Sequence, residues 1–220
     1  MRANEFIPEE IVDELAPKFV NKTIKKQGTW KSPTGKKKPP RGLTASVWQH
    51  MAEPDTVVKV VGGGRRAMLP SDKAATIAFV NFLVDYGKSS PHFPICYGVQ
   101  TDMSDPEEPV QVRLEKLLPL PLSGRIVGWE LESIAEFPGS SDAIRDLQRA
   151  LNGSIVNGVS LGEINNAQNI ANAVRLLNKK APYYQRKYKL QELFNDLHSD
   201  NWMLTPKGVV VMSDPWFGGR

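Results

Sequence analysis

The sequence has very little cysteine: Cys96 is the only one among 220 residues. A single thiol cannot form an intramolecular disulfide, so we expect a reducing compartment, the cytoplasm, and a thiol that packs as a small hydrophobic group. Runs of apolar residues long enough to cross a bilayer are also missing. The N-terminus has no apolar core or small-residue cleavage site of a signal peptide. These absences predict a globular, cytoplasmic protein with no membrane association.

Acidic residues are missing from one segment. Residues 15–41 carry nine Lys/Arg and no Asp/Glu, whereas the rest of the chain carries 19 Lys/Arg and 24 Asp/Glu. Lys36–Lys38 stand between a glycine and two prolines, which favours a solvated, extended stretch. A solvated linker is the favoured interpretation. The alternative is electrostatic contact with nucleic acid, with a nucleic-acid-bound target or with an acidic protein face.

The spacing of apolar and β-branched residues predicts an α+β fold, with a strand-rich first half and a helix-rich second half. Helices are expected over 5–20, 71–87, 142–151, 161–179 and 183–195. Strands are expected over 42–48, 56–61, 93–99, 110–114, 202–204 and 209–212. The last two strands flank a Thr-Pro-Lys-Gly turn and should form a hairpin.

Three polar residues near the end of the chain have the chemistry of phosphoryl transfer. Asp196 and Asn201 are five residues apart in an expected loop, and Asp214 follows the expected hairpin. Transfer from a nucleotide needs one carboxylate to accept the proton of the attacking hydroxyl. It also needs an amide oxygen and a second carboxylate to hold Mg²⁺. The hairpin would return Asp214 to the loop, so we expect an ATP·Mg²⁺ site there.

Lys59 is the candidate for the cationic group of this site. It lies in the middle of an apolar strand, Val57-Val-Lys-Val60, from which an ammonium group could pair with phosphate oxygens. Alternatively, Lys59 is an edge-strand lysine that discourages aggregation. His198 shows no metal-ligand spacing with the other histidines, so we expect it to brace the loop around Asp196.

The segments Asp196-Leu-His-Ser-Asp-Asn-Trp-Met203 and Ser213-Asp-Pro215 resemble the catalytic and metal-binding loops of the protein-kinase-like superfamily. The variant Asp-Leu-His-x-x-Asn is shared by aminoglycoside and choline phosphotransferases. With Val57–Val60, Ala74–Phe79 and Phe93–Val99 included, the chain most resembles the early serine/threonine protein kinases of T-odd-type podophages. The resemblance implies a minimal two-lobed kinase-like fold. Its strand-rich N-lobe would span 42–118 and its reduced helical C-lobe 119–220, after an N-terminal extension of 1–41.

The resemblance also implies roles for single residues. Asp196 would be the catalytic base, Asn201 and Asp214 the Mg²⁺ ligands, and Lys59 the lysine that contacts the phosphates of ATP. Further contacts to ATP would come from a loop over the phosphates and from a hinge beside the adenine, with Gly42 and Ser46 in the loop and Glu115 and Leu117 in the hinge. The implied substrates are host bacterial proteins.

The sequence departs from the kinase pattern in three ways. The loop over the phosphates lacks repeated glycines, only six residues follow Asp214, and the helix after Lys59 has no central glutamate. Either Asp72 replaces that glutamate or another group holds Lys59. Two alternatives therefore stay open. One is a phosphotransferase acting on small molecules, and the other is a pseudokinase that binds and inhibits a host protein.

Overall fold

A computed structural model describes residues 30–31, 45–50, 53–62, 69–101, 109–120 and 125–218. Helices and antiparallel sheets are both present, which confirms the predicted α+β class. The chain divides into two compact units. The first contains the described residues up to Val84 together with Ile95–Lys116, and the second contains Asp85–Pro94 and the described residues from Leu117 onward. The helix expected over 5–20 and nearly all of the basic segment lie outside the described residues.

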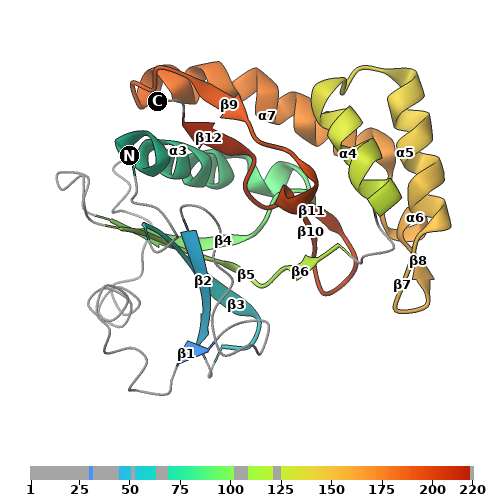
Figure 1. The fold of residues 1–220 in the computed structure, drawn as a ribbon, viewed down its shortest axis with the longest axis horizontal. Coiled ribbons are helices and arrows are strands. Elements are labelled where there is room, and N and C mark those ends of the chain that lie inside the picture. Colours follow the sequence, from blue (N-terminus) through green and yellow to red (C-terminus); the bar gives the residue numbers. More distant parts are fainter. Residues whose placement is uncertain are drawn as a thin grey trace. The chain divides into compact units, whose positions relative to one another are not determined.

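The first unit is built on a five-stranded antiparallel sheet (Figure 1). In order of pairing, its strands are β1 (Trp30–Lys31), β2 (Ala45–His50), β3 (Thr56–Val61), β5 (Val110–Glu115) and β4 (Cys96–Gln100). The prediction for β3 is confirmed to the residue, because its run of β-branched side chains suits a strand that has neighbours on both sides. The expected hairpin of β4 and β5 is confirmed as well, with a register shift between Cys96 and Gly98.

Helix α3 (Pro70–Tyr86) follows β3 along the chain, as predicted. Its N-terminus is capped by Asp72, whose Oδ2 accepts the N–H of Leu69 at 2.9 Å. Most of its apolar side chains are buried, so the helix is apolar on more than one side, as expected for an interior helix. The short 3₁₀ helix η2 (Gly87–Ser89) ends this segment.

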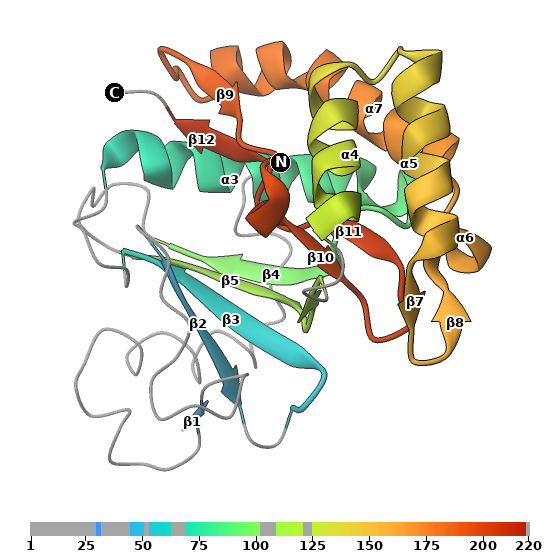
Figure 2. The same cartoon turned by 45° about the vertical axis from the view of Figure 1, so that its right-hand side comes forward.

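The second unit contains a group of helices (Figure 2). They are α4 (Arg125–Glu136), α5 (Ser141–Gly153), α6 (Leu161–Ile164) and α7 (Ala167–Lys187), with the hairpin β7 (Ile155–Val156) and β8 (Val159–Ser160) between α5 and α6. Their core consists of fully buried side chains: Val127, Leu131, Ile134, Leu147, Leu151, Ile170, Val174 and Leu177. The sequence analysis missed α4, although Val127, Leu131 and Ile134 have helical spacing.

Two helix predictions in this unit were wrong in their boundaries. The helix expected over 161–179 is two helices, because Asn166 caps α7 with its side chain and ends the preceding turn. The helix expected over 183–195 ends at Lys187, since Lys189 adopts a left-handed conformation with φ of 52°. Its last part forms β9 (Leu193–Asn195), which pairs with β12 (Trp216–Gly218). Pairing with a distant strand decided the structure there.

The predicted C-terminal hairpin is confirmed. It consists of β10 (Trp202–Leu204) and β11 (Val210–Met212), and β6 (Leu118–Pro119) pairs with the other side of β10. Gly208 takes φ of 83° in the turn, which glycine adopts without strain. Within the ranges that the structure describes, none of the helices combines the length and the apolar composition needed to cross a bilayer.

Asn165 joins the break between α6 and α7 to the C-terminal hairpin. It is 2% exposed, and its Nδ2 donates to Leu161 O and to Gly208 O, each at 2.9 Å. Its Oδ1 accepts the N–H of Val210 at 2.8 Å. A buried amide that makes three hydrogen bonds therefore fixes the start of β11.

Replacing Asn165 with Ala should lower the free energy of unfolding by about 2–4 kcal/mol, because buried backbone groups lose their partners. Chemical denaturation measures this change. Asn169→Ala, at an exposed position of α7, is the control and should change stability by less than about 0.5 kcal/mol. Equal effects of the two substitutions would show that the Asn165 amide does not hold the hairpin.

His92 is a second buried polar link to the hairpin. It is 2% exposed, its Nδ1 lies 2.8 Å from Val210 O, and its own carbonyl accepts the N–H of Met212 at 3.0 Å. Since a carbonyl oxygen only accepts, Nδ1 carries the proton. Burial lowers the pKa of His92, against a smaller opposing effect of the hydrogen bond to Val210. The ring is therefore held neutral.

This lowered pKa makes folding stability depend on pH. Below about pH 6.5 the unfolded chain binds a proton at His92 that the folded chain does not, so stability falls by up to about 1.4 kcal/mol per pH unit until the folded-state pKa is reached. Urea unfolding at pH 7.5 and pH 5.5 should show a loss of about 1 kcal/mol that His92→Asn removes. His198→Asn, at an exposed histidine, should leave the loss unchanged.

Candidate functional site

Two pairs of strands bring the three C-terminal candidates together. Asp196 follows β9, Asn201 ends the 3₁₀ helix η4 (Ser199–Asn201) just before β10, and Asp214 lies between β11 and β12. The pairing of Trp202 with Met212 and of Asn195 with Trp216 aligns the ends of these strands. Residues that are up to eighteen positions apart in the sequence thus meet at one end of two short ladders.

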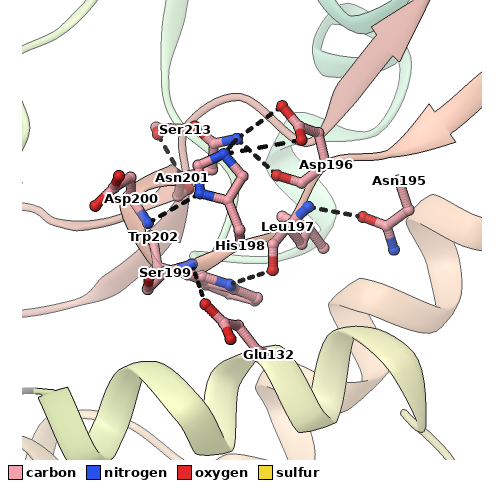
Figure 3. Close-up of polar contacts among 10 residues, drawn as sticks. All are labelled: Glu132, Asn195, Asp196, Leu197, His198, Ser199, Asp200, Asn201, Trp202 and Ser213. Atoms are coloured by element: carbon pink, nitrogen blue, oxygen red, sulfur yellow. Dashed lines mark hydrogen bonds and ion pairs between the residues drawn. The ribbon is translucent and has the colours of Figure 1, made fainter. Parts of the chain in front are cut away.

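The residues on both sides of Asp214 are hydrogen-bonded to the other two candidates. The N–H and Oγ of Ser213 both donate to Asn201 O, at 2.9 and 3.0 Å, as Figure 3 shows in part. On the other side, the N–H of Asp196 donates to Pro215 O at 2.8 Å. The backbone of Asp214 is therefore fixed between Asn201 and Asp196, as the expected hairpin requires.

The side chain of Asn201 is oriented by Asp196. Its Nδ2 donates to the backbone carbonyl of Asp196 at 2.6 Å and lies 3.1 Å from Asp196 Oδ2 (Figure 3). This fixes which end of the amide is used for protein contacts, because only the nitrogen can donate. The amide oxygen is then the atom that Asn201 can offer to a metal ion.

His198 contacts only residues of the same loop among its printed partners. Its Nδ1 lies 3.3 Å from Asp200 N, and its Nε2 lies 3.1 Å from Asn201 Nδ2 and 3.8 Å from Asp196 Oδ1. A neutral imidazole accepts at only one nitrogen, so His198 serves either Asp200 or Asn201 at one time. Both arrangements support the loop, and neither is a metal site.

Glu132 of α4 is a residue of the site that the sequence analysis missed. Its Oε1 accepts the N–H of Ser199 at 2.6 Å (Figure 3). One turn earlier, Gly128 lies so close to the loop that a Cβ there would be 3.3 Å from Ser199 Cβ. The Gly128-x-x-x-Glu132 spacing on one helix face was the available signal, but nothing in the sequence pairs it with residue 199. Trp202, which is 1% exposed, supports the loop from below by donating its Nε1–H to Leu197 O at 3.3 Å.

Lys59 lies in the first unit, in the interior of its sheet. It is opposite Val47 on β2 and Val112 on β5, and it is half-buried. Because β3 has strands on both sides, the alternative of an edge-strand lysine was wrong. Ser46 is opposite Val60, the neighbour of Lys59, so it points to the other face of the sheet. The sheet therefore does not bring the Ser46 hydroxyl and the Lys59 ammonium group together.

The remaining candidates in and beside the first unit have identifiable contacts. Ser46 is 3% exposed and accepts from Trp48 Nε1 at 3.1 Å. Glu115 Oε1 accepts the N–H of Ile95 at 2.9 Å, and burial raises the pKa of this carboxyl group more than that hydrogen bond lowers it. Leu117 is half-buried and lies between β5 and β6, and Gly42 lies outside the described residues.

The chemistry of the donors suits magnesium better than a transition metal. In the described part of the chain, no three His, Cys, Asp or Glu side chains gather as a metal site. One amide oxygen and one carboxylate, from Asn201 and Asp214, are instead the small all-oxygen set with which Mg²⁺ is bound in phosphate-transfer sites, where water and substrate supply the other ligands. Cys96 has no place in such chemistry, since burial raises the pKa of its thiol to about 11.

The sequence matches no known protein-family model, and a search of curated proteins finds no match either. The assignment of the site therefore depends on the residues and contacts described above.

The contact of Glu132 with Ser199 predicts a measurable rigidity of the loop. Glu132→Ala leaves the Ser199 amide without its acceptor, so amide hydrogen exchange at residues 197–201 should become about tenfold faster, the equivalent of one hydrogen bond. Glu132→Gln keeps an oxygen that can accept and should retain most of the protection. Glu136→Ala, an exposed position on the same helix, is the control. Unchanged exchange in Glu132→Ala would contradict a positioning role.

Proposed function

We propose that this chain is an ATP·Mg²⁺-dependent kinase that phosphorylates serine or threonine hydroxyls of proteins. The observation that carries the proposal is the placement of Asp214 between Asn201 and Asp196, through the hydrogen bonds of Ser213 and Pro215. Phosphoryl transfer needs a base and two metal ligands within one small region, and it asks for little covalent chemistry from the protein. Positioning of this kind is what the two strand ladders provide.

Asn201 and Asp214 are assigned the Mg²⁺. The amide nitrogen of Asn201 is held by Asp196, so its oxygen is left for the ion, and the carboxylate of Asp214 is one strand connection away. When bound, Mg²⁺ would neutralise charge on the phosphate oxygens of ATP. The task of the two side chains is to fix the position of the triphosphate relative to Asp196.

Asp196 is assigned the role of base. Its side chain is 43% exposed, so a substrate hydroxyl can reach it, and the hydrogen bond from Asn201 orients its carboxylate. The hydroxyl oxygen forms a bond to the γ-phosphorus as the bond from that phosphorus to the bridging oxygen of ADP breaks. The hydroxyl proton passes to Asp196. This stage requires no other proton acceptor.

Lys59 is assigned contact with the phosphates of ATP, which makes a two-lobed kinase-like arrangement part of the proposal. Its position at the centre of an apolar sheet favours a fixed direction for the ammonium group. Asp72 caps α3 through the N–H of Leu69, so its carboxylate already has a structural task at the place where a kinase glutamate was expected. The choice of host bacterial proteins as substrates, in the cytoplasm, follows from the resemblance of the loops to phage kinases.

The first test concerns Asp196. Asp196→Asn should lower transfer of labelled γ-phosphate by about 10²–10⁴-fold while MgATP binding, measured by calorimetry, stays within a few-fold of wild type. Asp200→Asn, four residues away in the same loop and exposed, is the matched control and should stay active. Transfer at the wild-type rate by Asp196→Asn would remove Asp196 as the base.

The acceptor is decided in the same assay with bacterial lysate. Labelled polypeptides support a protein kinase, whereas labelled small solutes with unlabelled protein would make the chain a small-molecule phosphotransferase. MgATP binding that is lost in Asp214→Asn, with no transfer by the wild type to either class, would indicate a binding protein with a kinase-like site. No binding of MgATP at millimolar concentration would end the proposal.

A further inference from the structure

The exposed side of α7 carries a row of basic residues. Arg175, Lys179, Arg186 and Lys187 recur at helical spacing together with Tyr183, and all five are exposed. We refer to these five residues as the α7 stripe. Between residues 164 and 191 the sequence has no Asp or Glu. At 1.5 Å per residue, the stripe extends over about 18 Å of one helix face.

The cations of the α7 stripe differ from exposed arginines elsewhere in the same unit. On α5, Arg145 pairs with Asp142 at 2.8 Å and Arg149 with Asp146 at 3.2 Å, so acidic neighbours offset their charge. None of the four cations of the stripe forms an ion pair with a carboxylate among the residues that the structure describes. The stripe is therefore a surface of uncompensated positive charge.

The stripe also holds an aromatic ring in a fixed position. Tyr183 is 51% exposed, and its ring contacts the ring of the fully buried Tyr184 edge-on, with centroids 5.0 Å apart. Lys187 Nζ lies 5.9 Å from the centroid of Tyr183. At the other end, Arg175 donates to Asn172 Oδ1 at 2.8 Å, which limits the directions its guanidinium can take. The surface thus offers one anchored ring beside oriented cations.

We propose that the α7 stripe binds single-stranded nucleic acid, with its cations on phosphates and a base stacked on Tyr183. A row of cations by itself would fit any polyanion, including an acidic protein surface. The exposed, anchored ring distinguishes the two, because every base has a face that stacks on an aromatic side chain, whereas Asp and Glu side chains do not. The stripe uses none of Lys59, Asp196, Asn201 or Asp214, so this inference does not depend on the proposed function.

The test is fluorescence anisotropy of the full chain with a labelled 15-nucleotide oligouridine, over a series of salt concentrations. Arg175→Gln with Arg186→Gln is compared with Arg145→Gln with Arg149→Gln, which removes the same charge from exposed positions of α5. The basic segment 15–41 is present in both variants, so its contribution is the same. Far-UV circular dichroism and thermal unfolding confirm that the variants are folded.

The α7 double variant should lower the slope of log K against log salt by about 1.4, or 0.7 per phosphate contact on a single strand, and the α5 variant should leave it unchanged. Tyr183→Ala should weaken binding by about fivefold or more with the slope retained, since stacking carries no charge. Equal slopes for the two double variants would overturn the proposal. Full competition by polyglutamate, with no effect of Tyr183→Ala, would assign the stripe to an acidic protein and also overturn it.

Discussion

The candidate site depends on two short antiparallel ladders that end at the same place. The pairs β10–β11 and β9–β12 are three residues long on each strand, yet they bring residues 196, 201 and 214 into one hydrogen-bonded group. The bonds of Ser213 to Asn201 and of Asp196 to Pro215 then leave Asp214 little freedom. Backbone pairing, which does not depend on the nature of the side chains, is what makes the chemistry of these three residues available together.

The helices of the second unit complete this arrangement. Glu132 holds the loop by one backbone N–H, and Gly128 allows the helix to approach it closely. Asn165 and His92 hold the far end of the hairpin by buried hydrogen bonds to Gly208 and Val210. Each of these links leaves a buried polar group unsatisfied if it is removed, so the loop is supported at several points by interactions that are costly to lose.

Charge is distributed unevenly on the helices, and this affects what each surface can bind. Acidic residues one turn away offset the arginines of α5, whereas the cations of α7 lack such neighbours and surround an exposed tyrosine. In the sequence, the consecutive lysines at 36–38 are far more conspicuous than the cations of α7, which are separated by three or four residues. Only the helix places the latter on one face.

The sequence by itself determined the α+β class, the strand β3, the helix α3 and the C-terminal hairpin, because each rests on local patterns of apolar residues and turns. It also identified Asp196, Asn201 and Asp214, since their spacing around a hairpin is a local property. Only the tertiary structure decided that 193–195 is a strand, that Ser46 and Lys59 point to opposite faces, and that Glu132 contacts residue 199. Those outcomes depend on which distant segments pair, and no local pattern encodes the partner.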